Sequence, residues 1–329
     1  MTQNTIARWI NPKVILVATN LVEGHTFMLH AIYQAKLSRA RVLLLHVIPP
    51  SYLRTESVYG RPFIQPSLLS QYVRAKLDEL AAEFQCEGIG CEPIILNGLP
   101  EDQIPTLVES RMVDRIIVAS RNASGVERLI GASIAEALIS SVAIPVCTIG
   151  RHTLPPLAST TPPKRILLAT SLQRESPMLA GFANALAESH HSHLTLLHVL
   201  DCAGMTEQER EVARCKAQLQ LSWLVPKEAR SRHQGVVLTQ EGEPTSFIPA
   251  AISSMSQDLI ILGAPFPSLI SWILGTSVVH RVIEEAECPV LTIKYSAGSD
   301  TSREVLYDSV DSEGLYVQSS RETQQITLS

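Results

Sequence analysis

The chain carries the same series of short motifs twice in the same order, and this duplication restricts its fold more than any other feature. Residues 13–20 read KVILVATN, and residues 164–171 read KRILLATS. Further matches follow at offsets that stay between 152 and 144 residues: LLHV with LLHV, Gly-x-Pro with Gly-x-Pro, Asp-x-Ile-Ile with Asp-x-Ile-Ile, and Pro-Val-x-Thr-Ile with Pro-Val-x-Thr-Ile. The pattern predicts two tandem domains of one fold.

The boundaries of these domains follow from composition. We expect one domain over residues 12–150 and the other over 164–296, a size that suits a chain of 329 residues. Residues 151–163 contain four prolines, which exclude a helix and favour a stiff, extended linker. Residues 297–329 are polar and lack sustained apolar periodicity, so we expect a flexible tail that contributes little to the core.

Within each repeat, short apolar runs alternate with helical patterns. In the first repeat, the runs predict strands near residues 14–18, 41–48, 92–96, 114–119 and 144–149. Between the second and third runs, apolar residues recur every three or four positions and predict one helix face: Leu69, Val73, Leu77, Leu80 and Phe84. Near-continuous apolar strands are typical of a parallel sheet covered by helices on both faces. The predicted fold class is therefore α/β, with two five-stranded parallel sheets.

The last strand of each repeat, residues 144–149 and 289–294, should lie at the edge of its sheet. Bare edges rich in Val, Ile and Cys would promote aggregation, so we expect them to be covered. We expect the two strands to meet across a pseudo-twofold axis, which would make the chain an intramolecular pseudo-dimer. Pro145 and Pro289 lack an N–H group and should precede the pairing.

Charge and hydropathy exclude several partners. The formal net charge is −5, the isoelectric point is near 6.1, and no long basic run is present, which argues against nucleic acids and anionic membrane surfaces. No apolar run approaches the roughly 18 residues that cross a bilayer, and the first residues do not resemble a signal peptide. We therefore expect a cytoplasmic protein that binds neither nucleic acid nor membrane.

Histidines and cysteines offer little evidence for catalysis or metal binding. The six cysteines form no CxxC pair, and we expect thiols and no metal. His46 and His198 recur at equivalent positions, which favours hydrogen bonding at a strand end. His190, His191 and His193 are most simply a solvated turn, and we interpret Trp223 as a core residue.

The order of these motifs resembles that of the universal stress protein family. The resemblance covers roughly residues 12–150 and 163–295. It implies two tandem Rossmann-like domains that pair through their last strands. Many members of the family bind ATP through a loop of the form Gly-x2-Gly-x9-Gly-Ser/Thr, in which glycines let backbone N–H groups approach the phosphates. In those relatives, an Asp after the first strand and the backbone near a Val of the second strand hold the adenosine.

This chain departs from that binding pattern in both repeats. The resemblance places the nucleotide-site equivalents of the first domain at Asn20, Val47, Ala119, Asn122, Ala132 and Ser133, and those of the second domain at Ser171, Val199, Gly263, Thr276 and Ser277. In the second domain, Pro265 and Pro267 remove backbone donors and Phe266 fills phosphate space, so we expect no binding there. A loop shifted to Gly131 or Gly275 is left open. For the first domain we expect at most weak binding of ATP or AMP, with a Kd on the order of 0.1–1 mM.

Two functions follow from the resemblance. The leading one is a stress-associated regulatory or binding protein that is not an enzyme, has lost or weak nucleotide binding and acts on an unknown protein partner. The alternative is an adenine-nucleotide-binding protein with slow ATP turnover. Further homodimerisation of the pseudo-dimer is also left open.

Overall fold

The computed structural model describes residues 3–50, 66–120, 134–156, 160–173, 175–226, 235–264 and 278–294, all within one compact unit, Met1–Tyr295. Some of the sequence predictions fall outside these ranges. They concern the two expected phosphate loops, with Asn122, Ala132, Ser133, Thr276 and Ser277, and the polar tail.

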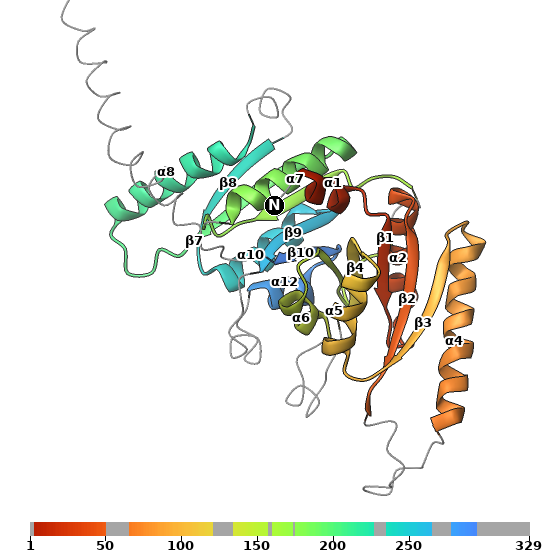
Figure 1. Cartoon of the computed structure of the whole chain (residues 1–329). Helices are drawn as coiled ribbons and strands as arrows, with labels where there is room; N and C mark the ends of the chain where they lie inside the picture. Colours follow the sequence, from red (N-terminus) through yellow and green to blue (C-terminus); the bar gives the residue numbers. More distant parts are fainter. Residues whose placement is uncertain are drawn as a thin grey trace, which may run out of the picture. The chain divides into compact units, whose positions relative to one another are not determined.

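The strands form one ten-stranded sheet with the order β3-β2-β1-β4-β5-β10-β9-β6-β7-β8 (Figure 1). Within each half, all neighbouring strands are parallel. The strands of the first half are β1 (Val14–Ala18), β2 (Arg41–Ile48), β3 (Cys91–Asn97), β4 (Arg115–Ala119) and β5 (Val146–Ile149). Those of the second half are β6 (Arg165–Ala169), β7 (His193–Leu200), β8 (Gly235–Glu241), β9 (Leu259–Ala264) and β10 (Val290–Lys294). The predicted α/β class and the duplication are confirmed.

Helices cover both faces of the sheet and build two cores, each of which continues through both halves. One face carries α1 (Gln3–Ile10), α2 (His25–Ser38), α4 (Pro66–Cys86), α7 (Ser176–His190) and α8 (Glu207–Leu224). The other carries α5 (Pro100–Ser110), α6 (Ile134–Ser141), α10 (Pro244–Met255) and α12 (Val278–Glu285). The predicted stripe on α4 faces the first core: Val73, Leu77 and Phe84 are buried, and Leu69 and Leu80 pack beside them. None of the described helices is long and apolar enough to cross a membrane.

The repeated Gly-x-Pro motif produces the same turn in both halves. Gly98 and Gly242 have φ angles of 139° and 152°, a conformation that favours glycine. Pro100 and Pro244 then begin α5 and α10, where a missing N–H group costs nothing because the first helical N–H groups have no partner in the helix.

The two halves join through their closing strands, as predicted. β5 and β10 pair antiparallel, with Cys147 opposite Leu291 at the centre of the register. Pro145 and Pro289 immediately precede the two strands. Because equivalent strands pair antiparallel, the halves form the expected pseudo-dimer.

Three local features differ from the sequence predictions. Trp223 is not a core residue, since it lies 55% exposed on α8. His190 is half-buried at the end of α7 and not in a solvated turn, because the predicted turn begins one residue later, at His191. Helix α1 was not anticipated, and its Trp9 is buried with its ring edge-on to Phe182, at 6.3 Å between centroids.

Candidate functional site

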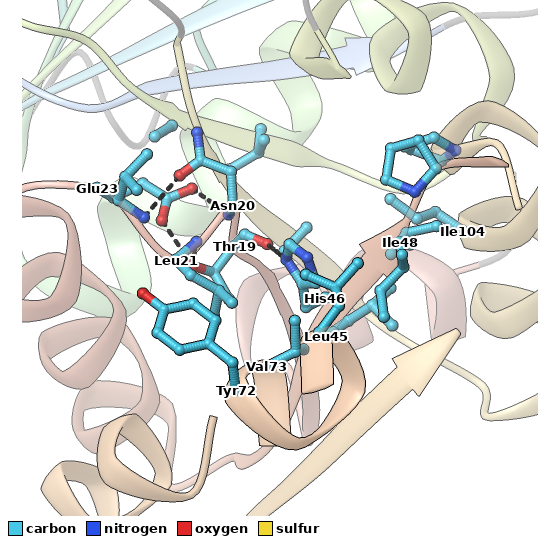
Figure 2. A pocket seen from close by; sticks show the side chains of 18 residues that line it. Thr19, Asn20, Leu21, Glu23, Leu45, His46, Ile48, Tyr72, Val73 and Ile104 are labelled. Atoms are coloured by element: carbon cyan, nitrogen blue, oxygen red, sulfur yellow. Dashed lines mark hydrogen bonds between the residues drawn. The ribbon is translucent and has the colours of Figure 1, made fainter. Parts of the chain in front are cut away.

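A cavity of about 350 Å³ opens in the first half where β1, β2 and β4 end (Figure 2). The carboxyl ends of parallel strands are the usual position for ligand sites in such sheets. The β1–α2 turn and the last residues of β2 and β4 form the floor, and α4 and α5 contribute Tyr72, Val73 and Ile104 to the walls. The lining is mainly apolar, with polar groups concentrated in the β1–α2 turn.

The β1–α2 turn is held by the carboxylate of Glu23. Its Oε2 accepts a hydrogen bond from Thr19 Oγ1 at 2.6 Å, and its Oε1 accepts one from the Asn20 backbone N–H at 2.5 Å. Leu21 takes a left-handed conformation with φ of 68°, and its N–H donates to Thr19 Oγ1 at 2.9 Å. The Asn20 Oδ1 accepts from the Val22 N–H at 3.0 Å. The turn therefore fixes both a carboxylate and an amide side chain beside the cavity.

His46, at the end of β2, also lines the cavity (Figure 2). Its Nδ1 lies 2.8 Å from the Thr19 carbonyl oxygen, so Nδ1 must carry the proton that is donated. His198 makes the same 2.8 Å contact with the Thr170 carbonyl oxygen in the second half. The predicted strand-end hydrogen bond is confirmed in both repeats, and it leaves His46 Nε2 as an acceptor in the neutral ring.

The second half builds the equivalent turn with different residues. Ser171 Oγ donates to Glu175 Oε1 at 2.6 Å, and Leu172 has a left-handed φ of 58°. Glu175 is 8% exposed. The sequence analysis missed both carboxylates, although a glutamate follows the Thr-x-Leu motif in each repeat and could have indicated them.

The cavity brings together three of the positions expected to hold a nucleotide. Asn20, Val47 and Ala119 come from three different segments and line the same space. Among the expected positions of the second half, Val199 lies in β7, Gly263 in β9, and Ser171 two residues after β6. Since β6 lies between β7 and β9, those three also occupy one end of the sheet.

Two α/β domains that pair through their last strands, each with a strand-end turn of this form, define a tandem Rossmann-like protein. The sequence matches the universal stress protein family over residues 12–149 and again over 162–294. The chain therefore belongs to the universal stress protein family and contains two of its domains.

Solved structures agree with this assignment at the level of the fold. A universal stress protein from Archaeoglobus fulgidus DSM 4304 superimposes with a TM-score of 0.66 and 19% identity, over 88% of this chain and 98% of that chain. A functionally unknown protein from Pseudomonas aeruginosa PAO1 gives a TM-score of 0.55 and 18% identity, over 87% of this chain and 94% of that chain. No curated protein matches the sequence significantly.

Proposed function

We propose that this protein is a stress-associated binding protein without catalytic activity, whose first domain keeps a low-affinity site for an adenine nucleotide. One observation carries the proposal: Asn20, Val47 and Ala119, which the family resemblance relates to nucleotide binding, line one cavity. The cavity also has the apolar walls and the few localised polar groups that are typical of sites for small molecules.

The cavity suits the nucleoside part of such a ligand. Tyr72 is 58% exposed at the wall and offers a ring face for a base. His46 Nε2 can accept a hydrogen bond, and the Glu23 carboxylate and Asn20 amide lie where sugar hydroxyls could donate. Because the Glu23 charge would repel phosphates, we place the phosphates away from the β1–α2 turn. Because Ala119 stands where the family's loop has its first glycine, we expect weak binding. The Kd should be on the order of 0.1–1 mM, which corresponds to a binding free energy of about −4 to −5.5 kcal/mol.

The absence of catalysis is inferred from how the ionisable groups of the turn are used. The Glu23 carboxylate binds Thr19 Oγ1 and the Asn20 N–H, and His46 donates its Nδ1 proton to a backbone carbonyl. Both groups are therefore held in place by the turn, and their remaining acceptor sites, including His46 Nε2, are assigned to binding the nucleoside.

Calorimetric titration of the full chain with ATP, AMP and adenosine tests the proposal. Asn20→Asp restores the family's acidic residue in the first domain, and Ser171→Asp is the matched change in the second. In Asn20→Asp, the new carboxylate is an ionised acceptor for a sugar hydroxyl and should strengthen ATP binding by about 1 kcal/mol, roughly fivefold. Ser171→Asp should not strengthen it.

Micromolar ATP binding by the unmodified chain, or equal effects of the two substitutions, would contradict the proposed site. Inorganic phosphate should not be released from ATP above the protein-free control. Steady release that scales with protein concentration would instead support the alternative of slow ATP turnover.

A further inference from the structure

A second, larger cavity of about 700 Å³ lies between the two halves of the molecule. It lies where β4, β6, β7 and β9 begin, beside α2, α7 and the end of α10, and the proline-rich linker forms part of its wall through Leu154, Pro155 and Pro162. The linker is anchored there, because Tyr33 Oη donates to the Thr161 carbonyl at 2.8 Å. The cavity shares no lining residue with the candidate nucleotide site.

The walls of this cavity are related by the repeat but differ in chemistry. Helices α2 and α7 end at equivalent left-handed residues, Arg39 and His191, so their preceding residues can be matched one by one. In the first half, Arg115 of β4 pairs with Ile15 of β1, and in the second half Leu259 of β9 pairs with Ile166 of β6. Arg115 and Leu259 therefore occupy equivalent positions. Three polar residues of the first half thus correspond to three apolar residues of the second: His30 with Phe182, Gln34 with Leu186, and Arg115 with Leu259. Of the three apolar counterparts, Leu186 and Leu259 also line the cavity.

Arg115 is the charged residue at the centre of the polar wall. It is only 9% exposed, and it donates through Nη1 to Gln34 Oε1 at 3.2 Å and through Nη2 to the Trp9 carbonyl at 2.6 Å. Its Nε has no hydrogen-bond partner, and no carboxylate of the described residues lies within ion-pair distance of it. Burial lowers the pKa of the guanidinium. A buried cation without a close anion is costly, which indicates that an anion belongs here.

The charge of the neighbouring Asp114 raises the pKa of Arg115 and so compensates its burial only in part, because the close contacts of Asp114 are with other groups. Its carboxylate contacts Arg8 Nη2 at 2.5 Å and accepts from the N–H groups of Lys13 at 2.8 Å and Val14 at 3.0 Å. Arg8, Asp114 and Arg115 together therefore carry one net positive charge.

Other buried polar atoms around the cavity also lack partners. His30 Nε2 contacts the Leu154 carbonyl at 2.8 Å, so in the neutral ring Nδ1 is an acceptor, and it has no donor. His190 Nδ1 and Gln257 Oε1 are likewise unpaired. With Arg115 Nε, four of the seven buried side-chain atoms without a partner in the described part of the chain belong to residues of this cavity. Since His30 Nδ1 and Gln257 Oε1 are acceptors, Arg115 Nε is the atom of this group that an anion could pair with.

The remaining lining limits what that ligand can be. Arg115, Lys164 and Arg165 are opposed by two carboxylates, and one of these, Asp258, is paired with Arg165 at 3.2 Å. The lining therefore has one more cation than carboxylates, which favours a ligand with a single negative charge. The second half contributes most of the charged lining residues and also an apolar patch of Leu186, Leu259 and Leu291.

We propose that the cavity between the two domains binds a small organic monocarboxylate, with the carboxylate at Arg115 and the hydrocarbon body against the leucines of the second half. A carboxylate matches the planar guanidinium and brings one charge. The repeat has diverged at Gln34 and Arg115, so these two polar residues and their apolar counterparts Leu186 and Leu259 line the same cavity. The proposal does not depend on the nucleotide site.

The test uses hexanoate as the probe on the full chain, with calorimetry and thermal unfolding, and hexanol as the uncharged control. Hexanoate should bind and raise the unfolding temperature, and hexanol should bind at least tenfold more weakly. Arg115→Leu should reduce hexanoate binding at least tenfold. The variant should fold, because Leu259 shows that leucine fits this register, and replacing a buried charge by an apolar residue is often neutral or stabilising.

Arg111→Leu is the matched control, since it makes the same change in a half-exposed arginine that pairs with Glu92 outside the cavity. It should bind hexanoate like the unmodified chain. Saturating ATP should leave hexanoate affinity unchanged. The proposal is overturned if hexanoate gives no binding at millimolar concentration, if hexanol or inorganic phosphate binds as tightly, or if Arg115→Leu binds hexanoate undiminished.

Discussion

At the scale of single residues, the two halves share a scaffold and differ in the side chains that could contact ligands. Asn20 and Ser171 occupy equivalent turns, each held by a glutamate. Arg115 and Leu259, in contrast, are a charged and an apolar residue at equivalent positions of the two halves. The sequence could predict Asn20, Val47 and Ala119 as neighbours, because strand ends in a parallel sheet converge. Arg115 was not predicted because its role depends on burial, which no local pattern reports, whereas the glutamate that follows each Thr-x-Leu motif was a local signal for Glu23.

His190 should make stability depend on pH. Burial, and secondarily the charge of Arg115, lowers its pKa to about 4 in the folded chain, against 6.5 when unfolded. Below pH 6.5 the unfolded chain binds the proton more readily, so the free energy of unfolding should fall as the pH drops from 6.5 towards 4. The pKa values of His30 and His198 are also lowered by burial and act in the same direction.

Urea unfolding at pH 7 and pH 4.5 measures this effect. His190→Gln should lose less stability between the two pH values than the unmodified chain, whereas His152→Gln, at an exposed position, should match the unmodified chain. Identical losses for His190→Gln and the unmodified chain would show that His190 does not titrate differently on folding.

At the scale of elements, the strands were the most predictable features. The predicted and observed strands of the first half agree within two residues at each end, because each is a short apolar run bounded by polar residues. Helix α1 has only eight residues, and its main contact, Trp9 with Phe182, joins segments far apart in sequence. Local periodicity cannot indicate such a contact.

The paired closing strands bury two threonine hydroxyls without partners, and these should limit stability. Thr148 and Thr292 are at most 1% exposed, and neither Oγ1 has a hydrogen-bond partner. Valine has nearly the same shape and no hydroxyl. We expect Thr148→Val to raise the free energy of unfolding by about 1 kcal/mol, since it removes an unsatisfied buried group.

Thr170→Val is the control for that substitution. The buried Thr170 hydroxyl donates to Ser176 Oγ at 2.7 Å, so its removal should destabilise the chain. Denaturant midpoints compare the three proteins. A loss of stability in Thr148→Val equal to that in Thr170→Val would indicate that Thr148 has a partner after all.

At the scale of the whole molecule, the tandem order and the joining strands followed from the sequence, whereas the cavity between the halves did not. It combines α2, α7, β4, β9 and the linker, and its asymmetry appears only when equivalent positions face one another across the junction. The continuity of the sheet and the cores also affects how the molecule unfolds. Because the sheet and both cores run through the two halves, they should unfold together.

Trp9 offers a direct test of this coupling. Its ring packs on Phe182 of the second half, and its carbonyl accepts from Arg115 of the first. Trp9→Ala should lower the free energy of unfolding by about 3–5 kcal/mol while keeping a single transition by circular dichroism in urea. Trp223→Ala, at a position 55% exposed, should change it by less than about 0.5 kcal/mol. Two separate transitions in Trp9→Ala, with only one of them shifted, would show instead that the halves unfold independently and that the shared sheet does not couple them.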